Sequence, residues 1–360
     1  MTSLLATGAT GAASSEAVVS VYLQPLPAAA ARLTFRPNAL VAVRADGTTV
    51  PLELRLREVS TAETARTRLL AAGVVAAGSY TGLALGTGSA TLRGDEGAVT
   101  LQTDGAPASI PFAFTADPAR PPVIALELRY AESIREDARF VPSFAASKPR
   151  RPAVELFGLV TLPARDLLAV FDRVTGDVVE QVATGRGPLG VAIEAGQRRA
   201  YVACAGEDLI QAVDLADGKI AVSRRLRVGD EPSWVAVTPD GRTVVVANAR
   251  SGTVVLLDAP GLTERKRIAV GTKPSYVRVD PAGRRAYVFD ELGDAVSVLD
   301  LGAGGVAAAV ASQGGPFRGE LDARGERLYV IHRSSPYLTV FDTATRETLD
   351  SIYVGPGATA

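Results

Sequence analysis

The side chains that could do acid–base or metal chemistry are few, because the protein has one histidine and one cysteine in 360 residues. A Ser-His-Asp arrangement would need His332 as its base, and a site with two histidine ligands cannot form within one such protein. The sequence contains no Gly-x-Ser-x-Gly motif, and the glycine-rich stretch at 86–94 lies among predicted strands instead of opening a helix. We therefore expect no catalytic set, no metal and no cofactor.

His332 belongs to a set of four equivalent positions, each at the end of a predicted strand and just before a polar loop. The set is Cys204, Asn248, Asp290 and His332. If these positions converged, Asn248, Asp290 and His332 would form a ligand or metal pocket. The alternative, which we favour, is that each polar residue hydrogen-bonds the backbone at its own strand end, as Asn and Asp commonly do.

A second set of equivalent positions holds large side chains that could bind a partner. Two residues after each of four regularly spaced prolines come Gly190, Trp234, Tyr276 and Arg318, and Phe317 precedes Arg318. Aromatic and guanidinium groups at the mouth of a channel can anchor a peptide, a glycan or a planar ligand. The alternative is that these residues cover the ends of a hydrophobic core.

The elements that would position both sets are set by a repeat. The segment "PSWVAVTPDGRTVVVAN" at 232–248 returns 42 residues later as "PSYVRVDPAGRRAYVFD" at 274–290. Two markers keep this register, a proline before the first run and an aspartate closing the third: Pro188, Pro232, Pro274 and Pro316, and Asp172, Asp214, Asp258, Asp300 and Asp342. Each unit contains four short alternating runs bounded by Gly, Pro or Asp turns. Four antiparallel strands in about 40 residues are typical of a propeller blade.

The predicted fold class is therefore all-β, with a β-propeller of four-stranded blades in the second part of the sequence. We count nineteen strands from residue 157 onwards, three in the first sheet and four in each of the next four. A propeller ring must be joined. Either a strand near 151–156 completes a five-bladed ring, or, as we expect, the five visible repeats belong to a truncated seven-bladed ring.

The first 150 residues lack the repeat and contain many short runs of alternating hydrophobicity, which favour a β-sandwich. A short helix is expected at 61–73. The predicted organisation is a flexible N-terminal segment at 1–15, an Ig-like β-sandwich domain at 16–144, a linker at 145–153 and the propeller at 154–360.

Two resemblances add to this prediction. The stretches "AYVACAGEDLIQAVDLADGK", "VVVANARSGTVVLLD" and "AYVFDELGDAVSVLD" resemble the YVTN family of propeller repeats, over about 157–360. That family includes bacterial and archaeal surface-layer proteins and secreted or periplasmic propellers. In the first part, "GSYT" (78–81), "ALELRYAESI" (125–134) and "FVPSF" (140–144) resemble an Ig-like domain at the N-termini of bacterial envelope lipoproteins. The resemblance implies an exported protein.

Composition is consistent with that implication. Charge is balanced at a formal −1 and only four of 38 basic residues are lysines, so no electrostatic footprint for nucleic acid is present. No apolar stretch is long enough for a transmembrane helix. Cys204 lies in a predicted strand, where we expect it to be a buried small hydrophobic residue.

The main hypothesis is a non-enzymatic binding or structural protein at the cell envelope or outside the cell. Its signal segment is not visible in this sequence. The propeller would be a rigid platform for a protein or glycan partner at the envelope, and copies could assemble into a surface layer or filament through open blade edges.

Two other functions stay open. A lactonase-like hydrolase with its site in the channel would depend on Asp290 and His332. Lactonase-like relatives carry histidine or acidic groups at the strand-entry positions, where this protein has Trp234, Tyr276 and Arg318. A propeller that binds single-stranded nucleic acid would use exposed aromatics and a positive groove.

Overall fold

The structure is a computed structural model, and it describes residues 15–95, 97–103, 105–135, 138–152, 156–196, 198–312 and 314–355. The contacts between residues divide the protein into two compact units. Unit 1 is Met1–Gly158 with Ala169–Ala183, and unit 2 is Leu159–Leu168 with Thr184–Ala360. The predicted flexible segment at 1–15 lies almost wholly outside the described residues, as does half of the segment 151–156. The predicted domain boundaries stay predictions.

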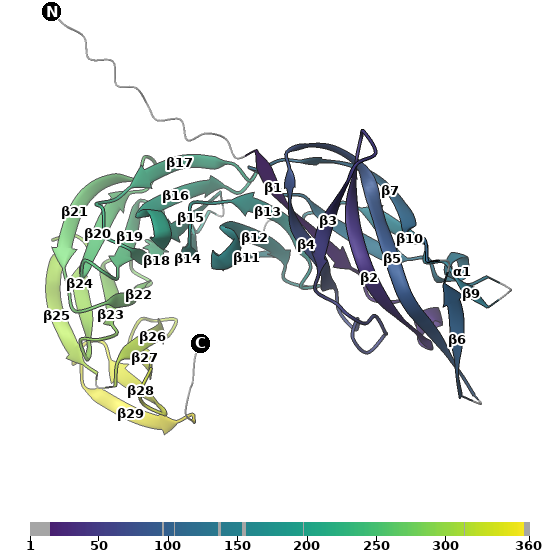
Figure 1. Ribbon diagram of the computed structural model, residues 1–360. Coiled ribbons are helices and arrows are strands. Elements are labelled where there is room, and N and C mark those ends of the chain that lie inside the picture. The colour runs from purple at the N-terminus through teal and green to yellow at the C-terminus, as the bar shows by residue number, and fades with distance from the viewer. Residues whose placement is uncertain are drawn as a thin grey trace, which may run out of the picture. The chain divides into compact units, whose positions relative to one another are not determined.

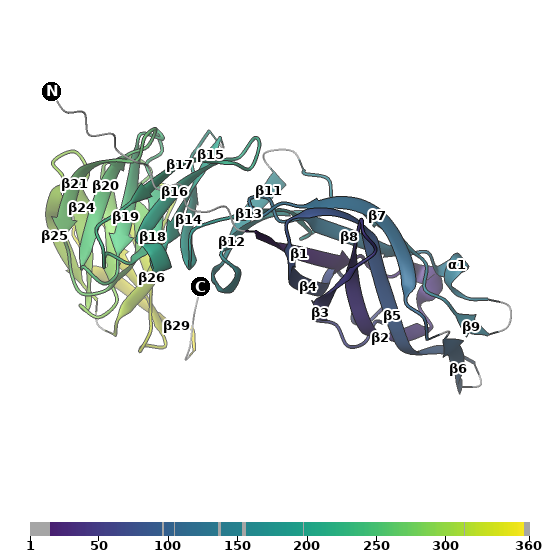
Figure 2. The same cartoon turned by 45° about the horizontal axis from the view of Figure 1, so that its top comes forward.

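Unit 1 contains a curled antiparallel sheet, which is the form that the predicted β-sandwich takes. Its elements are β1 (Glu16–Leu23), β2 (Leu33–Arg44), β3 (Thr49–Leu54), β4 (Arg68–Ala76), β5 (Gly78–Gly94), β6 (Gly97–Thr103), β7 (Ala108–Ala116), β8 (Val123–Leu128), α1 (Tyr130–Ser133), β9 (Arg139–Phe140) and β10 (Phe144–Ser147), with a 3-10 turn at Ala28–Ala30. The hydrogen-bonded order is β10-β8-β1-β4-β3-β2-β5-β6-β9, and β7 pairs with β5 (Figure 2).

The two halves of this sheet share one hydrophobic core. Val19 of β1 and Leu126 of β8 come from one half, and Phe35 of β2 and Leu83 of β5 come from the other; all four are buried. Alternation along each strand turns these side chains to the same interior, because successive residues of a strand face opposite sides of the sheet.

The helix expected at 61–73 is wrong. Residues 61–66 form turns, and Arg68–Ala76 forms strand β4, which pairs with β1 and β3. Leucine and alanine in this segment favour a helix on their own. Pairing on both sides of the strand and burial of Leu70, Ala71 and Val75 override that local preference.

In the described part of the protein, nineteen strands run from β11 to β29, as the repeat predicts. They are β11 (Phe157–Leu162), β12 (Leu167–Asp172), β13 (Val178–Ala183), β14 (Pro188–Ile193), β15 (Arg199–Cys204), β16 (Leu209–Asp214), β17 (Ile220–Arg225), β18 (Pro232–Val237), β19 (Thr243–Asn248), β20 (Thr253–Asp258), β21 (Thr263–Ala269), β22 (Pro274–Val279), β23 (Arg285–Asp290), β24 (Ala295–Asp300), β25 (Gly305–Ala311), β26 (Pro316–Leu321), β27 (Arg327–His332), β28 (Tyr337–Asp342) and β29 (Thr348–Tyr353). Short 3-10 turns lie at Pro163–Arg165 and Ala205–Glu207.

These strands form one three-stranded sheet, β11-β12-β13, and four sheets of four strands in sequence order. The four complete sheets follow one another along an arc, with β14, β18, β22 and β26 on its inner side and β17, β21, β25 and β29 on its outer side (Figure 1). This is the predicted propeller arrangement.

Alternation within a strand supplies the cores between sheets. In β19, Val244 and Val246 belong to the cluster shared with the preceding sheet, while Val245 and Ala247 belong to the cluster shared with the following sheet. All four side chains are fully buried. A single sheet could not cover both of these apolar faces, so the stacked sheets stabilise one another.

Side-chain hydrogen bonds join neighbouring inner strands. The Ser233 hydroxyl lies 2.7 Å from the carbonyl oxygen of Pro274 in the next sheet, and the Ser275 hydroxyl lies 3.1 Å from that of Phe317. Both serines directly follow a repeat proline, where the strand is bulged. The bulge leaves the serine outside the regular ladder, so its hydroxyl reaches the neighbouring sheet.

Candidate functional site

The inner strands of the complete sheets position the predicted binding residues. Each inner strand begins at a repeat proline, which has no N–H to donate, and each carries a register shift directly after it. Trp234, Tyr276 and Arg318 then occupy the same place in three successive sheets. Because neighbouring inner strands lie side by side, these three side chains lie together.

The resulting cluster consists of Trp234, Tyr276, Phe317 and Arg318, and we call it the aromatic–guanidinium cluster. The Trp234 and Tyr276 rings are tilted against each other, with centroids 4.7 Å apart. The Arg318 guanidinium carbon lies 4.9 Å from the Trp234 centroid, 5.3 Å from that of Phe317 and 5.8 Å from that of Tyr276. These distances are typical of cation–π contacts.

Arg333 is a member of this region that the repeat did not indicate. Its guanidinium carbon lies 4.3 Å from the Phe317 centroid, so Phe317 is contacted by two arginines. Arg333 also forms an ion pair with the buried carboxylate of Glu291, which Lys273 approaches at 3.1 Å. No regular spacing relates these three charged residues to the other sheets, so the sequence offered no signal for them.

Arg318 differs from its charged neighbours in its polar contacts. Arg278 lies 2.6 Å from Glu320, and Arg333 is paired with Glu291. Among the described residues, the Arg318 guanidinium has ring contacts but neither an ion pair nor a hydrogen bond. Its N–H donors are therefore free for solvent or a ligand.

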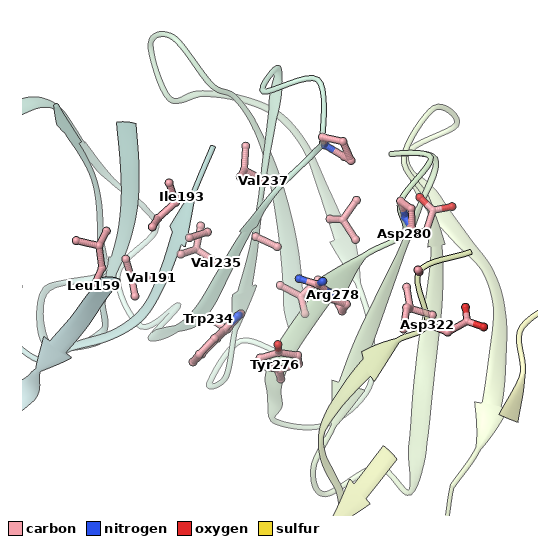
Figure 3. A pocket seen from close by; sticks show the side chains of 18 residues that line it. Leu159, Val191, Ile193, Trp234, Val235, Val237, Tyr276, Arg278, Asp280 and Asp322 are labelled. Carbon is pink, nitrogen blue, oxygen red and sulfur yellow. The ribbon is translucent and has the colours of Figure 1, made fainter. Parts of the chain in front are cut away.

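A hollow of about 570 Å³ opens beside the cluster, on the inner side of the sheets. Trp234 and Tyr276 line it, so these two rings contact both the hollow and the guanidinium (Figure 3). Its wall continues along the inner strands toward the strand-connecting turns and includes Val191, Ile193, Val235, Val237, Val277, Arg278, Asp280 and Asp322. The hollow is therefore apolar along its length, with carboxylates near the turn end.

The electrostatics of Tyr276 fit a neutral aromatic surface. Burial, with a smaller contribution from the Glu320 carboxylate, raises the pKa of the Tyr276 phenol. The ring therefore stays uncharged near neutral pH and contributes area and a π face to the cluster.

The family of this protein follows from a match to the model of YNCE-like beta-propellers, which covers residues 162–359. The chain belongs to the YNCE-like β-propeller family. The matched region includes both sets of repeat-equivalent residues and almost all of the described strands of unit 2.

Comparison with individual proteins gives fold-level likeness. None of the curated proteins matches. Among solved structures, the chain is similar to hydrazine synthase of Kuenenia stuttgartiensis, with 26% identity over 47% of this chain and 49% of that chain, at a TM-score of 0.44. It is also similar to the Cps50 (Swd1) β-propeller domain of Myceliophteria thermophila, with 14% identity over 55% of this chain and 70% of that one, at a TM-score of 0.43. The match thus spans about half the length of the hydrazine synthase chain.

The fourth member of the first set, Gly190, has no side chain for a packing reason. A Cβ atom at Gly190 would lie 2.6 Å from the Cα atom of Trp234 and 2.9 Å from the nitrogen of Val235. The inner strand of the next sheet therefore lies directly against this position. In this YNCE-like propeller the cluster begins one sheet later, at Trp234.

The second set does not line the hollow. Asn248, Asp290 and His332 end their strands opposite the repeat prolines, whereas the hollow extends toward the other end of the inner strands. All three side chains are buried. Within the described ranges, no group of three or more His, Cys, Asp or Glu side chains is arranged to hold a metal ion.

Each polar residue of the second set bonds groups beside its own strand end. Asn248 Nδ2 lies 3.1 Å from Thr253 Oγ1, and the Ser297 hydroxyl lies 2.6 Å from Asp290 Oδ2. His332 has Ser312 Oγ at 2.8 Å from Nε2 and the Tyr337 carbonyl oxygen at 3.2 Å from Nδ1.

Burial acts on the two titratable residues in opposite directions. It raises the pKa of Asp290 to about 6, against the effect of hydrogen bonds from Ser297 and the Gly271 backbone. It lowers the pKa of His332, although the Tyr337 carbonyl and the Asp294 carboxylate favour the charged imidazole. Both side chains are therefore pushed toward their neutral forms, as desolvation requires.

Cys204, in the same register, is fully buried, which confirms its prediction as a small hydrophobic residue. Burial raises the pKa of its thiol to about 12. The thiolate needed for nucleophilic or redox chemistry is therefore scarce at neutral pH.

A third repeated position carries a structural role that the sequence analysis missed. Asp166, Asp208 and Asp294 adopt positive φ angles in the tip loops. Their carboxylates accept hydrogen bonds from backbone N–H groups of the loops that lead into the next inner strands, as in the 2.8 Å bond from Gly229 to Asp208. Their regular spacing was the available signal.

Proposed function

We propose that this protein is a non-enzymatic binding protein whose propeller is a rigid platform for a protein partner. The partner segment docks on the aromatic–guanidinium cluster, with its apolar part against Trp234 and Tyr276 at the mouth of the hollow. The observation that carries the proposal is the convergence of Trp234, Tyr276 and Arg318 from three successive sheets, with the guanidinium left without a polar partner among the described residues.

Three features of the cluster support binding. Tryptophan, tyrosine and arginine are the residue types that most often dominate the energetics of protein interfaces. Their backbone is held by paired strands and by the Ser233 and Ser275 hydrogen bonds between sheets, so little ordering is needed on binding. The apolar hollow beside them offers a pocket for a side chain of the partner.

The test uses an array of ten-residue peptides of mixed composition, probed with the labelled full-length protein. We expect Trp234→Leu and Tyr276→Leu each to weaken the binding peptides at least tenfold, because each removes an aromatic anchor. The matched control is Tyr353→Leu, which alters an exposed aromatic pair on the last sheet, where the Tyr337 and Tyr353 rings lie 5.5 Å apart. Thermal unfolding is measured for every variant. Equal binding by wild type and both cluster variants, or equal loss in Tyr353→Leu, would remove the cluster from the mechanism.

We also propose that the protein acts outside the cytoplasm, at the cell envelope or beyond it, with an Ig-like first unit that spaces the propeller from its surroundings. The supporting features are the YVTN-like repeats and the buried thiol of Cys204, which leaves the one cysteine inaccessible to oxidation. Among the described residues, no helix has the length and hydrophobicity to cross a bilayer. Fractionation of the native cells tests the location, and recovery of the protein in the cytosolic fraction alone would contradict it.

A further inference from the structure

The Arg318 guanidinium is supported on its faces and left open at its edge. Three aromatic rings lie within 5.8 Å of its central carbon, and the side chain is partly buried. Contacts with ring faces do not use N–H groups that point in the guanidinium plane. A guanidinium has five such donors in a fixed planar fork. Among the described residues, none of them meets a protein acceptor.

A planar fork of donors beside apolar rings matches one chemical group best. Carboxylates accept two parallel N–H bonds from arginine, and bonds between ionised partners are about twice as strong as neutral ones. The rings hold the guanidinium in one place, so less side-chain entropy is lost when an anion binds.

The surrounding charges decide how many negative charges the ligand carries. Arg278 is paired with Glu320, and Arg333 and Lys273 share Glu291, so Arg318 supplies most of the local unpaired positive charge. Farther along the hollow, Asp280 and Asp322 contribute carboxylates. A polyanion extending along the hollow would be repelled there. One carboxylate on an apolar body meets no such opposition.

We propose that Arg318 binds a single carboxylate of the partner, either the α-carboxylate that ends a polypeptide or an Asp or Glu side chain, next to an apolar residue that packs on Trp234 and Tyr276. This assignment rests on the binding site proposed above and specifies the chemistry of its ligand. The aromatic–guanidinium cluster selects the acid, and the hollow receives the apolar group.

The protein has one tryptophan, so the fluorescence of Trp234 reports on this site alone. The full-length protein is titrated with two matched pairs of probes: N-acetylphenylalanine and its amide, and the blocked dipeptides N-acetyl-Phe-Glu-amide and N-acetyl-Phe-Gln-amide. We expect at least one acid to bind about tenfold or more tightly than its neutral counterpart, the usual effect of a hydrogen bond to a charged group. The pair that responds identifies the carboxylate as terminal or side-chain.

The variants assign the effect to Arg318. Arg318→Gln should bring the acid to the affinity of the neutral probe, and Arg318→Lys should give an intermediate value because it keeps the charge but loses the fork. Arg278→Gln is the matched control, since it removes an arginine that lines the hollow but is already paired with Glu320. Thermal unfolding verifies that each variant is folded.

Three outcomes overturn the proposal: equal affinities for acid and neutral probes, an unchanged preference in Arg318→Gln, or no change in fluorescence with either pair. Inorganic phosphate and a short oligothymidylate are added as competitors, and displacement of the acid by either one at lower concentration would show a polyanion site instead. The peptide array reports separately on the proposed function. Loss of peptide binding in Trp234→Leu together with equal acid and neutral affinities would overturn the carboxylate assignment and leave the binding function standing.

Discussion

Two sets of repeat-equivalent residues occupy opposite ends of the blades, and they behave differently. Trp234, Tyr276 and Arg318 on the inner strands contact one another across three sheets. Asp290 and His332 at the ends of the second strands each bond groups beside their own strand end. Equivalence in a repeat fixes a residue's place within its unit. Whether equivalent residues meet depends on how far that place lies from the neighbouring unit.

The inner strands bring their residues together because these strands approach one another most closely where the sheets converge. Hydrogen bonds from Ser233 and Ser275 span the gap between inner strands, and position 190 has no room for a side chain. Three substitutions, described in order of decreasing effect, would break or sharpen this comparison.

Gly190→Ala should have the largest effect, because its Cβ atom would collide with the backbone of Trp234 and Val235. Backbone yields less readily than a flexible side group, so we expect a loss of roughly 2–3 kcal/mol in the free energy of unfolding. Denaturant-induced unfolding measures it. Gly305→Ala is the matched control, a strand glycine whose Cβ would meet no atom within 4 Å. Similar losses in the two variants would show that the inner strands are not in close contact at Gly190.

Asp290→Asn should alter the pH dependence of stability. Because burial raises the pKa of Asp290 to about 6, the folded protein binds more protons than the unfolded protein between about pH 4 and pH 6. The stability that this carboxyl contributes is therefore full at low pH and is lost as pH rises through 6. We expect wild type to lose roughly 2 kcal/mol more than Asp290→Asn between pH 4 and pH 7. Unfolding free energies at several pH values give the difference between the two proteins.

The control for this experiment is Asp322→Asn, at an exposed carboxyl whose pKa is lowered by backbone hydrogen bonds despite an opposing effect of desolvation. Its contribution has the opposite sign, present at neutral pH and lost in acid. His332, with a pKa lowered by burial, also destabilises the fold as pH falls, so only the difference between wild type and variant isolates Asp290. Parallel pH profiles for wild type and Asp290→Asn would contradict the assigned burial.

Ser233→Ala should have the smallest effect of the three. It removes the 2.7 Å hydrogen bond to the Pro274 carbonyl in the next sheet, and a typical loss for one such bond is about 1 kcal/mol. Chemical denaturation again measures the change. Ser351→Ala, on the exposed outer strand β29, is the control. If both serine variants unfold alike, the bond does not join the sheets.

Much of the propeller could be predicted from sequence, because its strands are specified locally. Alternating β-branched residues and Gly, Pro or Asp turns recur in register, so each unit confirms the others. In unit 1 the prediction had one segment at a time to rely on, and it failed at 61–73. There, leucine and alanine favoured a helix, and only pairing with β1 and β3 made Arg68–Ala76 a strand.

The candidate site was predictable in part. The repeat selected Trp234, Tyr276, Phe317 and Arg318, which the structure brings together. It could not select Arg333 or Glu291, since neither has an equivalent of its kind in the other sheets. It also could not distinguish a paired arginine such as Arg278 from the unpaired Arg318, because the pairing partner depends on which side groups the fold makes neighbours.

The amino-acid sequence by itself determined the strands, their register and the equivalence of positions in successive sheets, because hydrophobic alternation and turn chemistry act over a few residues. The tertiary structure decided which equivalent residues meet, which are desolvated and which charges remain unpaired. Those properties depend on distances between sheets whose equivalent positions lie at least 42 residues apart in the sequence, and a periodic pattern contains no measure of such distances.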